Sequence, residues 1–200
     1  MSAFNYYTSD VVSIHEVYPG HYVQFLTMNA SSATRLDKIL GSYAFIEGWA
    51  HYSEQMVMDE GYGEVGPAAG DQPVALKAAK YRLAQLDESL LRVCRLCVAI
   101  QMHCHGMSVE EATKFFNENC YYGEKPSHAE AMRGTFDPGY ANYTLGKLMI
   151  LKLREDYKAQ EGSAYSLGKF HHEMLQHGTP PVPLLREVLL KDRRIWDQAL

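Results

Sequence analysis

The sequence predicts an all-α fold, a helical bundle or an orthogonal array of helices. Apolar residues recur every three to four positions along most of the chain, which is the period of amphipathic helices. No segment has the alternation of apolar and polar residues that is typical of strands, and no internal repeat is visible. With 200 residues, and with nothing that demands two domains, the chain is expected to form a single domain over residues 1–200.

The boundaries of the predicted helices follow from residues that start and stop helices. Pro19 and Gly20 interrupt the first helix. Ser108 and Glu111 have the spacing of a capping box, and Ser166 is a further N-cap. The predicted helices cover residues 9–29, 36–60, 74–105, 108–119, a segment from 127, 138–160, 166–178 and an amphipathic segment after 183, with a Gly- and Pro-containing loop over residues 66–73.

Composition excludes several classes of function. The chain has 19 Lys and Arg residues against 24 Asp and Glu residues, a net charge of −5, so no nucleic-acid partner is expected. Its apolar stretches, such as residues 96–100, are far shorter than the roughly 20 residues that span a bilayer. Residues 1–30 lack the pattern of a secretion signal, so the chain as given is expected to be cytoplasmic, with no membrane partner. Four cysteines are too few for a disulfide scaffold.

The segment HEVYPGH at residues 15–21 has the content of a zinc-peptidase motif, two histidines that bind the metal and a glutamate beside the first. A spacing of six residues would place His21 about 120° around a regular helix from His15 and roughly 9 Å along it, too far for one zinc ion. Pro19, however, clashes with the carbonyl of His15, and Gly20 tolerates unusual backbone angles. A bulge or kink is therefore expected to return His21 to the His15 face.

Glu47 is the expected third metal ligand. It shares one face of an otherwise apolar helix with His51 and Glu54, which lie four and seven residues further on. Gly48 costs a helix on the order of 1 kcal/mol relative to Ala, which suggests that another element approaches closely there. The predicted metal site therefore lies between two helices.

Three motifs resemble those of the bacterial domain-of-unknown-function family 885. They are HExYPGHxxQ at residues 15–24, EGWAxYxE at 47–54 and PGYAxYxxG at 138–146, and further similar stretches extend the resemblance over nearly the whole chain. Members of that family are helical, typically more than twice as long, and related in pattern to zinc metallopeptidases of the glutamate-ligand type. This chain resembles the C-terminal half of that family.

The resemblance implies zinc held by His15, His21 and Glu47, with Glu16 as the general base. The chain departs from the family pattern in two ways. It lacks the N-terminal half, which puts a closed substrate cleft in doubt. It also has Ala99 where an aspartate is expected, which puts full activity in doubt.

Four further residues are candidates for the site. Tyr143, and with less support Tyr140, could donate a hydrogen bond to an oxyanion or to the substrate. Arg133 could bind a substrate carboxylate bidentately, through two nitrogens of its guanidinium group. His103 matches the family pattern as a group that supports a metal ligand or contacts the substrate. Packing or surface exposure is the alternative for each of these residues.

The long helix over residues 74–105 is expected to be mostly buried in its second half. Cys94 and Cys97, followed by the segment HCH at 103–105, could form a structural zinc site, but cysteines in an apolar helix are better explained by core packing. His171, His172 and His177 are expected to pack or to cap a helix end.

The expected function is zinc-dependent hydrolysis of a peptide or another small amide, and an ester substrate stays open. The alternative is a truncated, non-catalytic metal-binding or assembly module. A third possibility is a helical protein whose histidines only pack. A homodimer could cover the face around the metal site, and full-length relatives can be exported.

Overall fold

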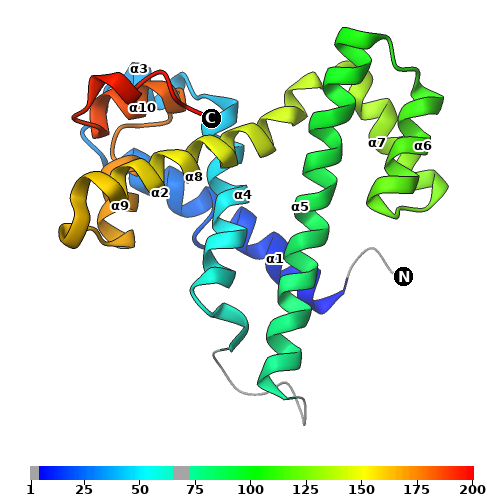
Figure 1. Ribbon diagram of the computed structural model, residues 1–200, viewed down its shortest axis with the longest axis horizontal. Coiled ribbons are helices and arrows are strands. Elements are labelled where there is room, and N and C mark those ends of the chain that lie inside the picture. Colours follow the sequence, from blue (N-terminus) through cyan, green and yellow to red (C-terminus); the bar gives the residue numbers. More distant parts are fainter. Residues whose placement is uncertain (1–4, 65–72) are drawn as a thin grey trace. The chain divides into compact units, whose positions relative to one another are not determined.

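The computed structural model describes residues 5–64 and 73–200, and the predicted loop at residues 66–73 falls almost entirely outside them. The described residues form helices joined by turns and contain no strand, which confirms the all-α class (Figure 1). They divide into two compact units. Unit 1 comprises Met1–Val12 and Gln55–Thr144, and unit 2 comprises Ser13–Glu54 and Leu145–Leu200.

Unit 1 is built around the 32-residue helix α5, Val74–His105. Gly106 ends α5 in the left-handed conformation, with φ 73°, and the Ser108–Glu111 capping box then opens the next helix as predicted. This helix, α6 (Val109–Cys120), packs against α7 (Glu124–Phe136), and both contact α5 (Figure 1). The short 3-10 helices η1 (Tyr62–Glu64) and η2 (Pro138–Ala141) also lie wholly within the unit, together with the end portions of three helices that continue into unit 2.

Unit 2 contains the first two sequence motifs and part of the third. Its helices are the C-terminal part of α1 (Tyr6–Glu16), α2 (His21–Ala30), α3 (Arg35–Ile39), most of α4 (Tyr43–Asp59), most of α8 (Asn142–Glu161), α9 (Leu167–Leu175) and α10 (Val182–Leu189). Ser166 caps α9 as predicted, since its side chain accepts a hydrogen bond from the Lys169 amide.

Helices α4 and α8 meet backbone to backbone at two glycines. A Cβ added to Gly48 would lie 2.4 Å from the carbonyl carbon of Gly146, and one added to Gly146 would lie 1.7 Å from the carbonyl oxygen of Ala44. The close approach that Gly48 suggested is therefore present, and the approaching element is α8. This contact fixes the segment of α4 that carries Glu47.

Two predicted helices are each divided in two. The helix predicted over residues 9–29 stops at Glu16 and restarts at His21, so the expected kink is a complete break between α1 and α2. The helix predicted over 36–60 is likewise separated into α3 and α4 by a break at residues 40–42. The cause of the first break is local, because Pro19 has no N–H to donate and its ring would clash with the carbonyl of His15 in a continuous helix.

The prediction that the second half of α5 is mostly buried was only partly right. Cys94, Arg95 and Val98 are buried, but Val93 and Ile100 remain 41% and 46% exposed. Cys97 is also exposed, so the core-packing explanation holds for Cys94 and is wrong for Cys97. The apolar residues of α5 therefore lie on two faces of the helix, one of which is packed while the other is mostly exposed.

Candidate metal centre

The break between α1 and α2 brings the two histidines of the first motif together. His15 lies in the last turn of α1 and His21 is the first residue of α2, and their ring centroids are 4.8 Å apart. Gly20 is required at this corner because a Cβ there would lie 1.8 Å from the carbonyl oxygen of His15. The indole N–H of Trp49 donates to the Pro19 carbonyl at 3.0 Å, which ties the break to α4.

Glu47 of α4 completes the group. Its Oε2 lies 3.5 Å from Nε2 of His15 and 3.4 Å from Nε2 of His21. In the part of the chain that the structure describes, His15, His21 and Glu47 are the one set of three or more metal-binding side chains whose ligand atoms converge, all within 4.8 Å of one another. The candidates Cys94, Cys97, His103 and Cys104 do not form such a set there.

The geometry of these three residues fits zinc. Two ligands that are each about 2.1 Å from a tetrahedral ion lie about 3.4 Å from each other, close to the two separations measured to Glu47. The buried Glu47 Oε2 has no hydrogen-bond partner, which is costly for a carboxylate unless a cation binds it. Burial alone would raise the pKa of the Glu47 carboxyl, but the adjacent imidazoles of His15 and His21 lower that pKa to about 2. Glu47 is therefore an anion at neutral pH.

Glu54 orients His15. Its carboxylate is fully buried and lies 2.6 Å from Nδ1 of His15, while its second oxygen lies 3.2 Å from Nδ1 of His51. A proton on Nδ1 that is donated to Glu54 leaves the lone pair of Nε2 directed at the position between His21 and Glu47. This is the usual relation between a metal-binding histidine and its outer carboxylate. The sequence placed Glu54 on the Glu47 face but gave it no role.

Glu16 is the last residue of α1 and directly follows His15. Its side chain is exposed, in contrast to the buried His15. One turn beyond His21, Gln24 is 1% exposed and neither atom of its amide has a hydrogen-bond partner. This motif residue was not assigned a role from the sequence, and the only signal for it was its place in the pattern HExYPGHxxQ.

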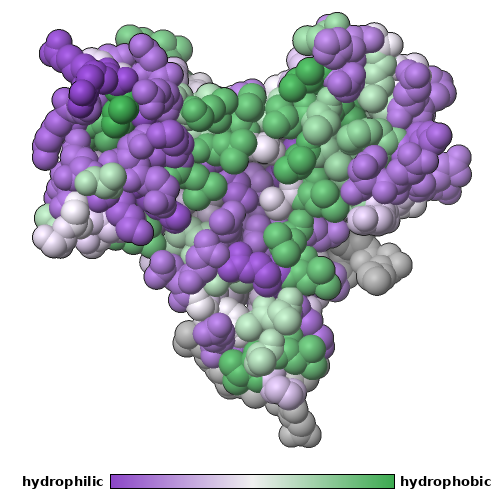
Figure 2. Space-filling view, in the orientation of Figure 1, coloured by the Kyte–Doolittle hydropathy of each residue, from purple (hydrophilic) through white to green (hydrophobic). Residues whose placement is uncertain are grey.

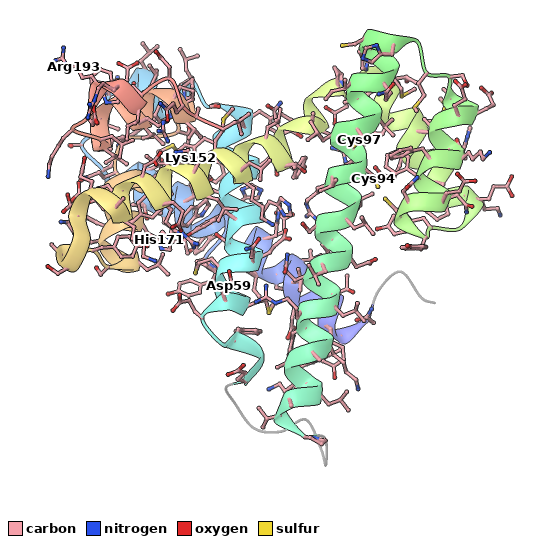
Figure 3. All side chains as sticks on the ribbon, viewed as in Figure 1. Asp59, Cys94, Cys97, Lys152, His171 and Arg193 are labelled. Carbon is pink, nitrogen blue, oxygen red and sulfur yellow. The ribbon has the colours of Figure 1, made fainter. Side chains whose placement is uncertain are left out.

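A second layer of aromatic and polar side chains packs behind Trp49. His171 of α9, labelled in Figure 3, contacts the Trp49 ring edge-on and shares a 2.9 Å hydrogen bond with the Tyr52 hydroxyl. Arg154 donates to the same hydroxyl at 3.3 Å. Burial and the charge of Arg154 lower the pKa of His171 to about 4, so this histidine is neutral. The expectation that His171 packs fits this environment.

The other four candidate residues all belong to unit 1. Tyr140 is fully buried, and Arg95 and Arg133 each lie over its ring, 5.8 Å from the centroid. Burial and Glu130 raise its pKa to about 12, and its hydroxyl has no hydrogen-bond partner. Tyr143 is half-buried, and Arg92 and Arg95 lie over its ring, 5.5 and 5.7 Å from the centroid.

Arg133 and His103 have partners within unit 1. Arg133 donates to Asp137 at 2.9 Å. Nε2 of His103 lies 2.8 Å from the carbonyl oxygen of Gly134, and the rest of that side chain is exposed. The catalytic and substrate-binding roles of these four residues remain predictions.

Two solved structures are similar to the chain, and each is described as a putative lipoprotein. The one from Shewanella oneidensis, of unknown function, is 28% identical with a TM-score of 0.81, and covers 94% of this chain. The one from Colwellia psychrerythraea is 29% identical with a TM-score of 0.82, and covers 96% of this chain.

The chain spans about one third of the length of these proteins, 32% and 31% respectively. No curated protein matches the chain. None of the described helices is long and apolar enough to cross a membrane. The family model for bacterial proteins of unknown function called DUF885 matches residues 1–189, and the chain therefore belongs to this family.

Proposed function

We propose that the chain carries the zinc site of a hydrolase that cleaves peptide-like amides. The observation that carries the proposal is the convergence of His15, His21 and Glu47 within 4.8 Å, from three different helices. Two imidazoles and one carboxylate are the ligand set of many catalytic zinc sites, which leave the fourth position open. Glu54 supports the same assignment because it selects the tautomer of His15 that can bind a metal.

Each residue of the site has a distinct task. His15, His21 and Glu47 would hold the ion, which when bound lowers the pKa of a coordinated water to about 7. Glu16 is the general base, since its exposed carboxylate can accept a proton from the attacking water and pass it to the leaving amine. Glu54 positions His15 and does not meet the substrate.

A non-catalytic metal-binding module is the second candidate. It is favoured by Ala99, which is buried in α5 at the place where the resemblance to the family leads one to expect an aspartate. Turnover of a peptide library by the zinc-loaded chain separates the two candidates.

The first test is elemental analysis of protein purified without added metal, for which we expect about one zinc per chain. Two variants then distinguish the role of the Glu16 carboxylate from that of the Glu47 carboxylate. Glu16→Gln keeps its size but cannot accept a proton, so zinc should remain while hydrolysis falls by about 10²–10⁴-fold. Glu47→Ala removes a charged ligand, so zinc affinity should fall, and thermal stability with it.

Glu60→Gln is the matched control, since Glu60 is an exposed carboxylate just after α4, and it should change neither quantity. A zinc content near zero that added zinc does not restore would refute the proposal. If Glu16→Gln released the metal while Glu47→Ala retained it, the two roles would have to be exchanged.

A further inference from the structure

The outward face of α5 carries a continuous apolar stripe. Its members are spaced alternately three and four residues apart and all are apolar or cysteine: Leu76, Ala79, Leu83, Leu86, Leu90, Val93, Cys97, Ile100 and Cys104. The residues that α5 buries inside unit 1 lie between these positions, among them Gln85, Leu91 and Val98. The helix therefore has one packed face and a second apolar face that is mostly unpacked, on which Leu90 alone is half-buried and packs against the hydrophobic core of unit 1.

Most of this stripe is open to solvent. Leu83 and Leu86 are 68% and 53% exposed, Ile100 is 46% exposed, and Cys97 and Cys104 are exposed as well. Figure 2 shows hydrophobic residues along the length of α5 on the face in view. Single exposed apolar residues are normal, but a contiguous row of this length marks an interaction surface.

The spacing indicates what kind of element fits the stripe. Alternating steps of three and four give a seven-residue repeat, in which the apolar positions a and d form the seam of a left-handed coiled coil. The stripe from Leu76 to Cys104 has a at 76, 83, 90, 97 and 104, and d at 79, 86, 93 and 100, which makes four repeats. Three to four repeats are the length at which such a seam becomes a credible coiled coil. Its natural partner is a helix with the same repeat.

We propose that this partner is α5 of a second copy of the chain, packed parallel and in register. The repeat is self-complementary, because each a or d side chain meets its own counterpart in the other copy. Charge at the flanking positions agrees with this orientation. In a parallel pair, position g of one helix faces position e five residues further along the other, which places Arg82 opposite Asp87.

The remaining flanking positions do not oppose the parallel pair. Lys80 would face Ala75, Ser89 would face the buried Cys94, and Leu96 would face Gln101, so no like charges meet. Arg82 already binds Asp59 at 2.6 Å in an exposed ion pair, and its guanidinium has further N–H groups for a second carboxylate. An antiparallel pair loses the Arg82–Asp87 contact. In that orientation a residue at position e faces position e of the other helix, and a residue at position g faces position g.

Two native cysteines make the proposal directly testable. Cys97 and Cys104 both occupy a positions, so a parallel pair in register places each beside the same residue of the other copy. Copper phenanthroline in air should then link the copies, because it oxidises a pair of thiols to a disulfide and passes the two electrons to O2, which also takes up the two protons. We expect a disulfide-linked dimer that disappears in Cys97→Ser/Cys104→Ser and persists in Cys94→Ser, since Cys94 is buried.

Sedimentation equilibrium of the whole chain gives the second readout, for which we expect twice the 22.7 kDa monomer mass. Leu83→Glu should weaken the dimer by about 30-fold or more, because it replaces an apolar seam contact with a charge. Leu184→Glu on α10 is the matched control, since Leu184 is a 49% exposed leucine outside the stripe, and it should leave the mass unchanged. Circular dichroism verifies that both variants fold.

Orientation is tested by charge. Asp87→Arg should weaken the dimer, and the exchange Arg82→Asp/Asp87→Arg should restore it. A dimer that Leu83→Glu dissociates but that forms no link through Cys97 or Cys104 would overturn the parallel assignment. A monomer over the whole concentration range, or a dimer insensitive to Leu83→Glu, would overturn the proposal, and the stripe would then await a helix from a different polypeptide.

Discussion

Two groups of buried and half-buried polar side chains differ in whether each charged side chain has a partner of opposite charge. In the first, which we call the paired cluster, Arg95 binds Glu130 with two hydrogen bonds of 2.8 Å and Arg133 binds Asp137 at 2.9 Å. The ring of Tyr140 lies beneath both arginines. Each positive charge thus has a negative partner within the protein, and the cluster needs no ion.

In the second group, the open cluster of His15, His21 and Glu47, the carboxylate lies 3.5 and 3.4 Å from two imidazoles, which carry a positive charge only when they are protonated. Three side chains that are all good metal ligands converge, and the buried Oε2 of Glu47 and Nδ1 of His21 have no hydrogen-bond partners. A buried carboxylate is costly unless it is paired with a cation. Both clusters contain motif residues, so membership of a motif does not distinguish a structural role from a ligand-binding role. The two roles are distinguished by whether the charges and hydrogen bonds of the cluster are matched within the protein.

Zinc should therefore stabilise one cluster and leave the other unchanged. At a free zinc concentration of 1,000 times Kd, we expect the free energy of unfolding to rise by about 4 kcal/mol. Hydrogen exchange followed by mass spectrometry should show added protection in α2 and in the part of α4 around Glu47. Equal protection of α6 and α7 would show that zinc binds elsewhere as well, and the contrast between the clusters would be lost.

Removing a partner from the paired cluster should destabilise the protein without affecting zinc. Arg95→Met leaves the 18% exposed carboxylate of Glu130 without its partner, so we expect a loss of about 3 kcal/mol, the lower end of the range for buried ion pairs. Denaturant unfolding measures this loss, and elemental analysis should still find zinc. Arg194→Met is the control, because the 88% exposed Arg194 forms an ion pair with Asp192 at the surface, where solvent screens the charges, and its loss should leave the stability nearly unchanged.

Much of the fold could be predicted from sequence because its signals are local. The capping box at Ser108, the N-cap at Ser166 and the bounds of α5 depend on residues a few positions apart, and the structure agrees with them. The juxtaposition of His15 with His21 also followed from a local effect, the inability of Pro19 to continue the helix. What a local argument could not give was the extent of that effect, a full break instead of a bulge.

Contacts between segments distant in sequence were harder to predict. Gly48 indicated a close approach, but nothing near it in the sequence named Gly146 as the other side. The apolar pattern of α5 likewise gave a helix but could not show which of its apolar positions are packed. Glu54 stood on the correct face, yet its bond to His15 spans 39 residues and emerges only when α1 meets α4.

Glu54 adds to the comparison because it has hydrogen-bond partners within the protein, like the paired cluster, and yet orients His15 of the open cluster. Glu54→Gln keeps the size of the side chain but weakens the hydrogen bond that orients His15, so zinc affinity should fall by about 10–100-fold. Titration with a competing chelator measures the change. A fall as large as that of Glu47→Ala would mean that Glu54 binds the ion itself, and no change would remove its positioning role. Glu60→Gln again serves as the control.

His171 gives the smallest expected effect and tests a third way of satisfying a buried polar group, by a neutral hydrogen bond. Because burial lowers its pKa to about 4 from an ordinary value of 6.5, the unfolded chain binds more protons than the folded one between these pH values. Stability from this residue is therefore complete above pH 6.5 and is lost as the pH falls towards 4. One proton sets the upper limit of the slope, about 1.4 kcal/mol per pH unit.

In metal-free protein, where zinc release does not contribute, His171→Phe should flatten this part of the pH profile of unfolding. The phenylalanine keeps the ring contact with Trp49, and Arg154 still donates to the Tyr52 hydroxyl. His172→Phe is the matched control, since His172 is exposed on the same helix and should leave the slope unchanged. If His171→Phe also left the slope unchanged, His171 would titrate alike in the folded and unfolded chains, and burial without a counter-charge would not be what keeps it neutral.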